Sequence, residues 1–227
     1  MTITYKLTET YENYLEAIYN MHDEAPTSGQ KIINARLADR LGVKPPTVSQ
    51  TLRRMSRDGL VKIDGEITLT KQGHEIAEAS IRRHRIIERF MSDILGIEWA
   101  VAHREAERLQ HAISLLIEDK MLAALGHPTT CPHGNPIPGM MSTQLPTEAI
   151  TLDNTRENQI VEILRITEEG ERDPRLLDYL EKQGLIPGVQ ITVLEVVEYT
   201  GVVTFKKNNQ TIALGLKAAR TIWVNPV

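Results

Sequence analysis

The sequence has one cysteine and no long apolar run. Because Cys131 has no partner within the chain, a disulfide framework is excluded and a reducing compartment, the cytoplasm, is expected. No stretch of about 18 apolar residues and no apolar N-terminal segment of the secretory type is present, so we expect neither membrane insertion nor export. The 227 residues are 41% hydrophobic, which is enough for one large domain or two to three small ones.

The formal net charge of −4 hides a strong asymmetry along the chain. Residues 31–62 contain eight basic side chains against only two acidic ones, a local net charge of +6, so the rest of the chain carries −10. Such a distribution indicates that this segment binds a polyanion and that the rest of the protein does not.

The basic segment has the element order of a winged helix. A helix is expected from Thr8 to about Met21, a short one over 33–41 closed by Gly42, and a third that begins at Pro45-Pro46. Asp64-Gly65 then predicts a two-residue β-hairpin. Three apolar residues of the third helix fall at i, i+4 and i+7 and are expected to face inward: Val48, Leu52 and Met55.

The polar face of this third helix has the chemistry to read DNA. Gln50 can pair with adenine in the major groove, while Thr47 and Ser49 can reach phosphates or the thymine methyl group. Arginines along the same helix can neutralise the phosphate backbone. The alternative is a surface helix whose charged residues contact only water and bind no DNA. The expected DNA-binding residues are Arg36, Lys44, Pro46, Thr47, Ser49, Gln50, Arg53 and Arg54.

The remainder predicts a helical domain, a linker and a small β domain. Residues 73–125 read as two long amphipathic helices with a break near Leu95-Gly96, and their apolar faces suggest a two-fold dimer interface. Five of the eleven prolines lie in 126–152, which reads as a linker, and the β-branched runs beyond it predict an SH3-like barrel. The fold class is α+β, and the expected domains are 1–73 (winged helix), 74–142 (helical dimerisation domain), 143–152 (linker) and 153–227 (SH3-like domain).

Two His and Glu patterns in the helical region suggest metal ligands. His84 and Glu88 are four residues apart, and His103, Glu107 and His111 repeat that spacing, which places each set on one helical face. A surface hydrogen bond between such residues is the competing interpretation.

An enzyme is a weaker alternative. The stretch HREAERLQH lacks the H-E-x-x-H spacing of zinc proteases, and the two Glu-x-x-His pairs of di-iron bundles do not occur. We therefore expect no enzymatic activity. A third possibility is a winged-helix regulator that senses a small molecule without metal.

The run ARLADRLGVKPPTVSQTLRRMSRDGLV resembles the DNA-binding segment of the diphtheria toxin repressor family. That family of metal-dependent regulators includes the iron repressors and the manganese regulator MntR. The resemblance continues in order through RRHRIIERFMSDILG, HREAERLQH, GNPIPG and GLIPGVQITVLEV, and so covers nearly the whole chain. It implies a homodimer that binds palindromic double-stranded operator DNA when loaded with a divalent metal, and that represses metal-uptake genes.

The resemblance also implies two metal sites per chain. The family's primary site falls here on Asn13, Glu107, Gln110 and His111, with Glu16 at the position of an additional carboxylate of the manganese branch. The ancillary site falls on His84, Glu88 and His103, joined by two residues of the SH3-like domain, Glu168 and Glu171.

Departures from the family pattern bear on which metal is used. Iron-type members present a thioether and a thiol where this chain has Asn13 and Glu107, and harder oxygen ligands favour Mn²⁺, with Fe²⁺ as the second choice. The manganese branch has carboxylates where this chain has Asn13 and Gln110, so we expect one ion at the primary site and one at the ancillary site. Zn²⁺ or Co²⁺ is expected to substitute in vitro.

Cys131 and His133, in TTCPHGNPIPG, form another potential ligand pair. No second pair lies nearby at the spacing of a zinc site, so a structural turn is the preferred interpretation.

Overall fold

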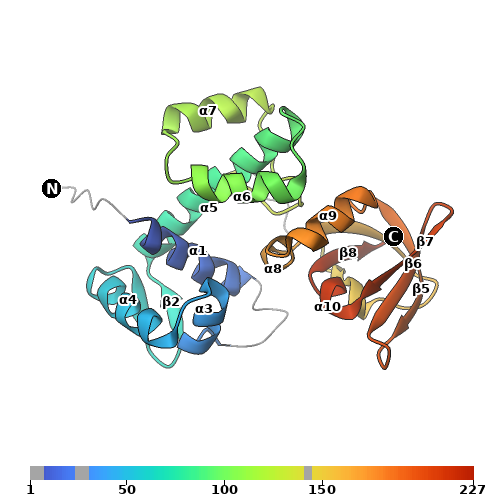
Figure 1. Ribbon diagram of the computed structural model, residues 1–227, viewed down its shortest axis with the longest axis horizontal. Coiled ribbons are helices and arrows are strands. Elements are labelled where there is room, and N and C mark those ends of the chain that lie inside the picture. The colour runs from blue at the N-terminus through green and yellow to red at the C-terminus, as the bar shows by residue number, and fades with distance from the viewer. Residues whose placement is uncertain (1–7, 24–30, 141–144) are drawn as a thin grey trace. The chain divides into compact units, whose positions relative to one another are not determined.

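The computed structural model describes residues 8–23, 31–140 and 145–227 (Figure 1). The chain forms two compact units, residues 1–83 and 84–227, and each is considered by itself. Within the described ranges, no helix is long and apolar enough to cross a membrane.

The first unit has the winged-helix order that the sequence predicts. Its elements are α1 (Glu9–Asp23), α3 (Asn34–Leu41), α4 (Pro45–Arg57), β1 (Val61–Ile63), β2 (Ile67–Leu69) and the first part of α5 (Lys71–Asp93). Gly42 ends α3 with a φ of 64°, a left-handed conformation that glycine adopts without steric cost. Pro45 and Pro46 occupy the first turn of α4, where a missing N–H breaks no helical hydrogen bond.

The core of this unit is built by one face of each helix. Val48, Leu52 and Met55 of α4 are buried, as their spacing predicts, and they pack with Leu15 and Ile18 of α1. Burial of this face leaves the polar face of α4 toward solvent.

The wing differs from its prediction in one respect. Ile63 pairs with Ile67, so the connection holds three residues, Asp64, Gly65 and Glu66, rather than two. Gly65 takes a φ of 65°, and the Asp64 N–H donates to the Glu66 carbonyl oxygen. The Asp-Gly pair predicted the position of the turn correctly, but it did not predict the length of the connection.

The helical region contains three helices where two were predicted. After α5 come α6 (Trp99–Leu109) and α7 (Leu115–Ala124). The chain leaves the helical path after Leu109, and the Ser114 hydroxyl accepts a hydrogen bond from the Ile117 N–H to start α7. His111 therefore lies in the turn beyond α6, so His103 and Glu107 share that helix but His111 does not.

The C-terminal part is an antiparallel sheet with short helices. Its elements are β3 (Ile150–Thr151), the 3₁₀ turn η1 (Leu152–Asn154), β4 (Ile160–Ile166), α8 (Glu168–Glu171), α9 (Pro174–Lys182), β5 (Gln190–Val197), β6 (Val202–Lys207), β7 (Gln210–Gly215), α10 (Leu216–Ala219) and β8 (Ile222–Pro226). The strand order is β3-β8-β4-β5-β6-β7, an open SH3-like sheet rather than a closed barrel over the described residues. Ile150 and Thr151, in the predicted linker, pair with β8.

The proline-rich segment after α7 is packed rather than free. Cys131, His133, Asn135 and Ile137 are all buried. The Ile166 N–H donates to the His133 carbonyl oxygen, which attaches this loop to the end of β4. The expectation of a linker over all of 126–152 is therefore wrong for this loop; residues 141–144 lie outside the described residues.

Gly134 lets the loop approach β4 closely, and its replacement should be costly. A Cβ at Gly134 would lie 2.2 Å from the Leu164 carbonyl oxygen, and the φ of 88° disfavours any L side chain. Gly126 is a matched control, because its φ is 71° but nothing lies within 4 Å of its Cβ position.

We expect Gly134→Ala to lower the unfolding midpoint of this unit clearly more than Gly126→Ala, whose cost is strain alone, roughly 1–2 kcal/mol. Tryptophan fluorescence during denaturation measures this, because Trp99 and Trp223, the chain's two tryptophans, both lie in residues 84–227. Equal losses for the two variants would show that the close approach to β4 does not matter.

Candidate metal centre and nucleic-acid interface

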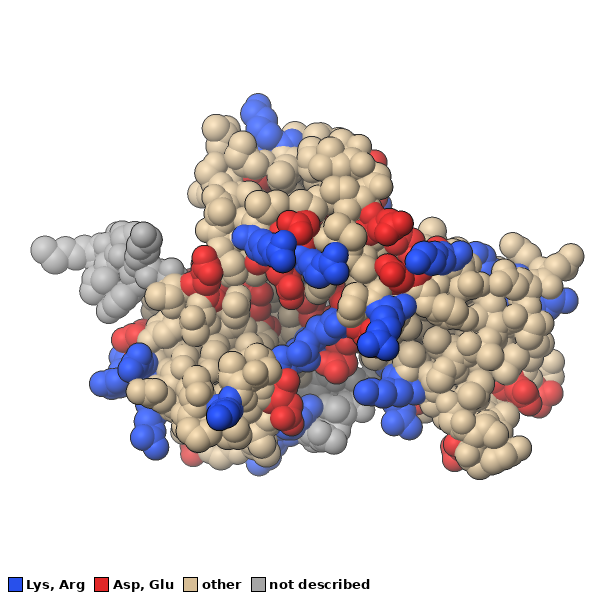
Figure 2. All heavy atoms as spheres, in the orientation of Figure 1, with Lys and Arg blue, Asp and Glu red and all other residues tan. Residues whose placement is uncertain are grey.

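The exposed face of α4 carries the residues predicted to read DNA. Lys44, Pro46, Thr47, Gln50, Arg53 and Arg54 are exposed. Figure 2 shows basic side chains gathered over the part of the N-terminal unit that holds α4. The face therefore combines amide and hydroxyl groups for base edges with cations for phosphates.

Two of the predicted DNA-binding residues already have partners inside the unit. The Ser49 hydroxyl accepts from Asn34 Nδ2 at 2.8 Å and donates to the Pro45 carbonyl oxygen, so it ties α3 to α4. Arg36 donates to the Lys31 carbonyl oxygen at 3.0 Å. Ser49 thus holds α4 against α3, whereas Arg36 ties α3 to the segment that precedes it. Their contact with DNA stays a prediction.

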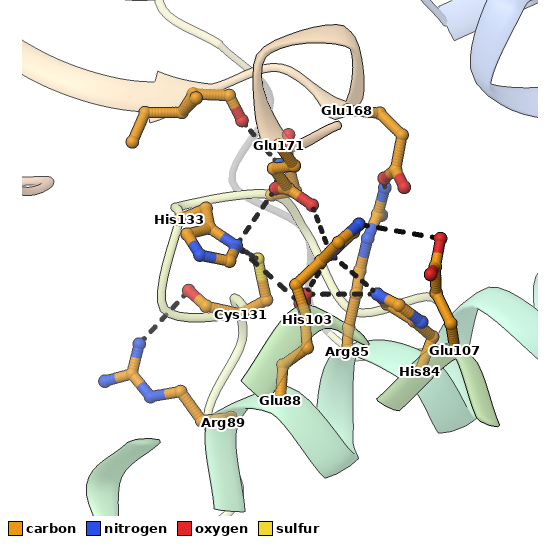
Figure 3. Close-up of polar contacts among 12 residues, drawn as sticks. His84, Arg85, Glu88, Arg89, His103, Glu107, Cys131, His133, Glu168 and Glu171 are labelled. Carbon is orange, nitrogen blue, oxygen red and sulfur yellow. Dashed lines mark hydrogen bonds and ion pairs between the residues drawn. The ribbon is translucent and has the colours of Figure 1, made fainter. Parts of the chain in front are cut away.

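In the second unit, the five residues expected at the ancillary site do come together. We call His84, Glu88, His103, Glu168 and Glu171 the ancillary cluster (Figure 3). Glu88 Oε1 lies 2.7 Å from His103 Nδ1 and 3.1 Å from His84 Nε2. Glu171 Oε2 lies 3.6 Å from His103 Nδ1. Helices α5, α6 and α8 thus supply imidazole and carboxylate groups to one buried point.

Arg85 and Gln110 hold the edge of this cluster. Arg85 Nη2 lies 3.6 Å from Glu168 Oε2, while its Nη1 donates to the Pro136 carbonyl oxygen. Gln110 Oε1 lies 2.6 Å from His84 Nδ1. Because an amide oxygen only accepts, Nδ1 of His84 carries a proton, and its Nε2, which faces Glu88, is the nitrogen that can give up a proton to bind a metal ion.

Charge interactions keep Glu88 and Glu168 ionised despite burial. Burial opposes ionisation of Glu88, but the positive charges of His84 and His133 and the hydrogen bond from His103 outweigh it and hold the Glu88 pKa well below its usual value. Burial likewise opposes ionisation of Glu168, and the Arg85 guanidinium beside it lowers the pKa of that carboxyl. Carboxylates and imidazoles thus face one another in the cluster, and together they are the donor set of a divalent metal site.

The structure adds two ligand candidates that the sequence interpretation set aside. Cys131 and His133 form a turn, as predicted, and both are buried in it. In addition, His133 Nδ1 lies 3.2 Å from Glu171 Oε1, 3.7 Å from Glu88 Oε2 and 3.9 Å from Cys131 Sγ (Figure 3). Glu88, Cys131 and His133 therefore form a second group of potential ligands.

Nearby carboxylates shape the protonation of this second group in the absence of metal. Burial opposes protonation of His133, but Glu171 and Glu88 outweigh it and raise the His133 pKa well above its usual value. Burial and the charge of Glu171 raise the pKa of the Cys131 thiol. A metal ion bound here would replace both protons, because only the thiolate and the neutral imidazole are ligands.

The residues expected at the primary site are divided between the two units. In the first unit Asn13 is exposed and Glu16 half-buried. In the second unit the Glu107 side chain is 60% exposed, Gln110 is buried against His84, and Gln110 Nε2 lies 3.4 Å from His111 Nε2. Each unit holds part of the predicted set, and the primary site as a whole stays a prediction.

Comparison with known proteins identifies three family domains in order. Residues 6–67 match the DNA-binding domain of the iron dependent repressors, residues 70–139 their metal-binding and dimerisation domain, and residues 150–226 the FeoA domain. The chain is 34% identical to the iron-dependent repressor IdeR of Mycobacterium tuberculosis, across 98% of this chain and 99% of that protein. It is 33% identical to the diphtheria toxin repressor of Corynebacterium diphtheriae, across 95% of this chain and 96% of that protein.

A solved structure of a manganese-dependent transcriptional repressor in complex with manganese is similarly close. It is 34% identical, covers 96% of this chain and all of its own, and superposes with a TM-score of 0.81. Relatives named for iron and for manganese are thus equally similar. The chain belongs to the iron-dependent repressor family of metal-dependent, DNA-binding transcriptional repressors, which are not enzymes.

Proposed function

We propose that this protein is a manganese-responsive homodimer that binds a palindromic operator when loaded with metal and represses genes for metal uptake. Because its ligand is operator DNA, its site of action is the cytoplasm. Gln50 and Thr47 of α4 face the bases, and Lys44, Arg53 and Arg54 face the phosphates.

The choice of manganese rests on one observation: the only thiol of the chain is not among the proposed primary ligands. Cys131 lies in the loop beside His133 and Glu88, whereas the proposed primary ligands Asn13, Glu107 and His111 offer only oxygen and nitrogen. Oxygen and imidazole donors suit Mn²⁺, and soft thiolate donors favour other ions. Glu107 is therefore the residue that distinguishes a manganese sensor from an iron sensor here.

The same family with Fe²⁺ as its effector is the second candidate. The buried thiol of Cys131 next to His133 favours it, because a thiolate and an imidazole suit Fe²⁺ better than Mn²⁺. Zn²⁺ and Co²⁺ would substitute in vitro at either set of ligands.

The proposed switch acts on the spacing of the two reading helices. Successive major grooves on one face of DNA lie about 34 Å apart, so a dimer reads both half-sites only when its two α4 helices hold that separation. Metal at the primary site would tie Asn13 and Glu16 of α1 to Glu107 and His111. A change from mostly unbound to mostly bound requires about 5.5 kcal/mol of differential metal affinity, and less for a partial change.

Operator binding in the presence and absence of metal tests this proposal. Under anaerobic conditions, fluorescence anisotropy with a labelled AT-rich palindrome should show at least about tenfold tighter binding with Mn²⁺ than with chelator. Glu107→Ala and His111→Ala should each remove most of that difference, because each deletes a primary ligand.

Glu105→Ala is the matched control for these two variants. Glu105 is also an acidic residue of α6, but it forms a surface ion pair with Arg108 at 2.9 Å, and its loss should leave the metal response intact. Equal operator affinity with Mn²⁺ and with chelator would contradict the switch. If both ligand variants then also bind the operator as the parent does, a regulator that needs no metal is favoured.

A set of exposed apolar side chains supports the proposed homodimer. Within residues 84–227, six large apolar residues of the helical segment are exposed: Ile94, Leu95, Leu109, Leu115, Leu116 and Ile117. Leu115 and Leu116 are 73% and 65% exposed, which is unfavourable for adjacent leucines in water. A second copy of the chain would cover them, as a two-fold helical interface does.

Replacing both leucines by charge should separate the protomers. Leu115→Asp combined with Leu116→Asp is expected to give a monomer in light scattering after size-exclusion chromatography, and to weaken operator binding at least about tenfold, because one half-site is then bound alone. Tyr199→Asp, at an apolar side chain that is 92% exposed between β5 and β6, should remain dimeric. A dimer that survives the double substitution would rule out this face.

A further inference from the structure

Two buried carboxylates are shared between the ancillary cluster and the pair Cys131–His133. Glu88 directs Oε1 to His103 and His84, at 2.7 and 3.1 Å, and its other oxygen, Oε2, to His133 Nδ1 at 3.7 Å. Glu171 does the same: Oε2 lies 3.6 Å from His103 Nδ1 and Oε1 3.2 Å from His133 Nδ1. Each carboxylate thus presents one oxygen to each of two neighbouring sets of donors (Figure 3).

The two donor sets differ in chemistry. The first holds His84, His103 and Glu168 with one oxygen of Glu171, and these donor atoms lie within 4.8 Å of one another. The second holds Cys131 and His133 with one oxygen of Glu88, within the same limit. Each set is compact enough to surround one ion with bonds of about 2.0–2.3 Å after small side-chain shifts.

A buried oxygen atom without a hydrogen-bond partner indicates that an ion binds at the second set of donors, beside Cys131 and His133. Glu88 is fully buried, and its Oε2 has no hydrogen-bond partner. A buried carboxylate oxygen without a partner is costly, so the site calls for a donor or a cation there. His133 Nδ1 lies 3.7 Å from Oε2, beyond hydrogen-bond distance, and His133 with Cys131 supplies the other ligands of that position.

We propose that residues 84–227 hold a carboxylate-bridged pair of divalent first-row metal ions, with Glu88 and Glu171 as the bridging ligands. The first ion takes the nitrogen and oxygen donors of the ancillary cluster. The second takes Cys131 Sγ and His133 Nδ1, which favour a softer ion such as Fe²⁺, Co²⁺ or Zn²⁺. Two ions bridged in this way lie roughly 3.5–4 Å apart. The pair deepens the proposed function, on which it rests only in assuming divalent ions as ligands.

Cobalt titration of the full-length protein tests the pair directly. The titration uses a background with Glu107→Ala and His111→Ala, so that the primary site does not contribute, and is carried out without oxygen. Two Co²⁺ equivalents per chain are expected, together with a thiolate-to-cobalt charge-transfer band and magnetic coupling between the ions in electron paramagnetic resonance.

Substitutions separate the shared ligands from the others. Cys131→Ser should abolish the charge-transfer band and one equivalent while the other ion still binds. Glu88→Gln, which keeps the shape of the side chain, should weaken both ions at least tenfold, because it replaces one bridging oxygen by an NH2 group and removes the negative charge that both ions share. Glu78→Gln is the matched control: Glu78 pairs with His74 at the same four-residue spacing on α5, at 3.4 Å but on the surface, and its loss should change neither ion.

One equivalent without the charge-transfer band, or two magnetically isolated ions, would overturn the proposal. Loss of only one ion in Glu88→Gln would also overturn it. Circular dichroism identifies a variant that fails to fold. In that case, the presence or absence of magnetic coupling in the protein with Glu88 and Cys131 intact decides whether the two ions form a pair. If two coupled ions bind but the operator affinity of the unsubstituted protein ignores metal, the proposed function fails and the pair stands. If one ion binds and operator affinity depends on metal, the pair fails and the proposed function stands.

Discussion

Glu88 is fully buried, and its carboxylate stays ionised there because imidazole groups surround it. The need to surround this buried carboxylate with imidazole groups determines how several segments of the second unit pack. His84 comes from one turn earlier on α5, His103 from α6 and His133 from the loop after α7, so three separate segments must converge on one side chain. Glu171 of α8 repeats two of these contacts, which brings the C-terminal sheet domain into the same arrangement.

Supporting contacts position the ligands rather than supply them. Gln110 fixes the tautomer of His84, Arg85 holds Glu168, and Asn135 donates to Glu171 Oε1. Trp99 packs edge-on against the His133 ring, with ring centroids 4.7 Å apart, and contributes to the core of the C-terminal sheet. Metal affinity in such a site depends on these neighbours as well as on the ligands themselves.

Local sequence patterns predicted the winged helix well. The spacing of Val48, Leu52 and Met55, the glycine that ends α3 and the prolines that start α4 are each sufficient to place an element, because helix periodicity and capping are local properties. The Asp64-Gly65 signal gave the hairpin but not its three-residue connection. The stretch from His103 to His111 suggested one helix, yet the chain turns after Leu109, a break that periodicity alone does not reveal.

The metal cluster was only partly predictable. His84 and Glu88 are neighbours on one helical face, so their spacing indicated a site, whereas Glu168 and Glu171 followed from the family resemblance. Cys131 and His133 were set aside because no second pair lies nearby in the sequence. Their partner Glu88 lies on another helix, and only tertiary packing brings it close. The available signal was the Cys-Pro-His turn before Gly134, a position that tolerates no side chain beside β4.

Coupling between metal and operator is the central claim, and it works in both directions. If Mn²⁺ tightens operator binding by a given factor, operator DNA must tighten Mn²⁺ binding by the same factor. The most direct measurement is therefore the Mn²⁺ affinity of the full-length protein with saturating operator and with a scrambled duplex of equal length. We predict tighter Mn²⁺ binding with the operator, by the factor found for DNA; equal Mn²⁺ affinity with both duplexes would contradict the account.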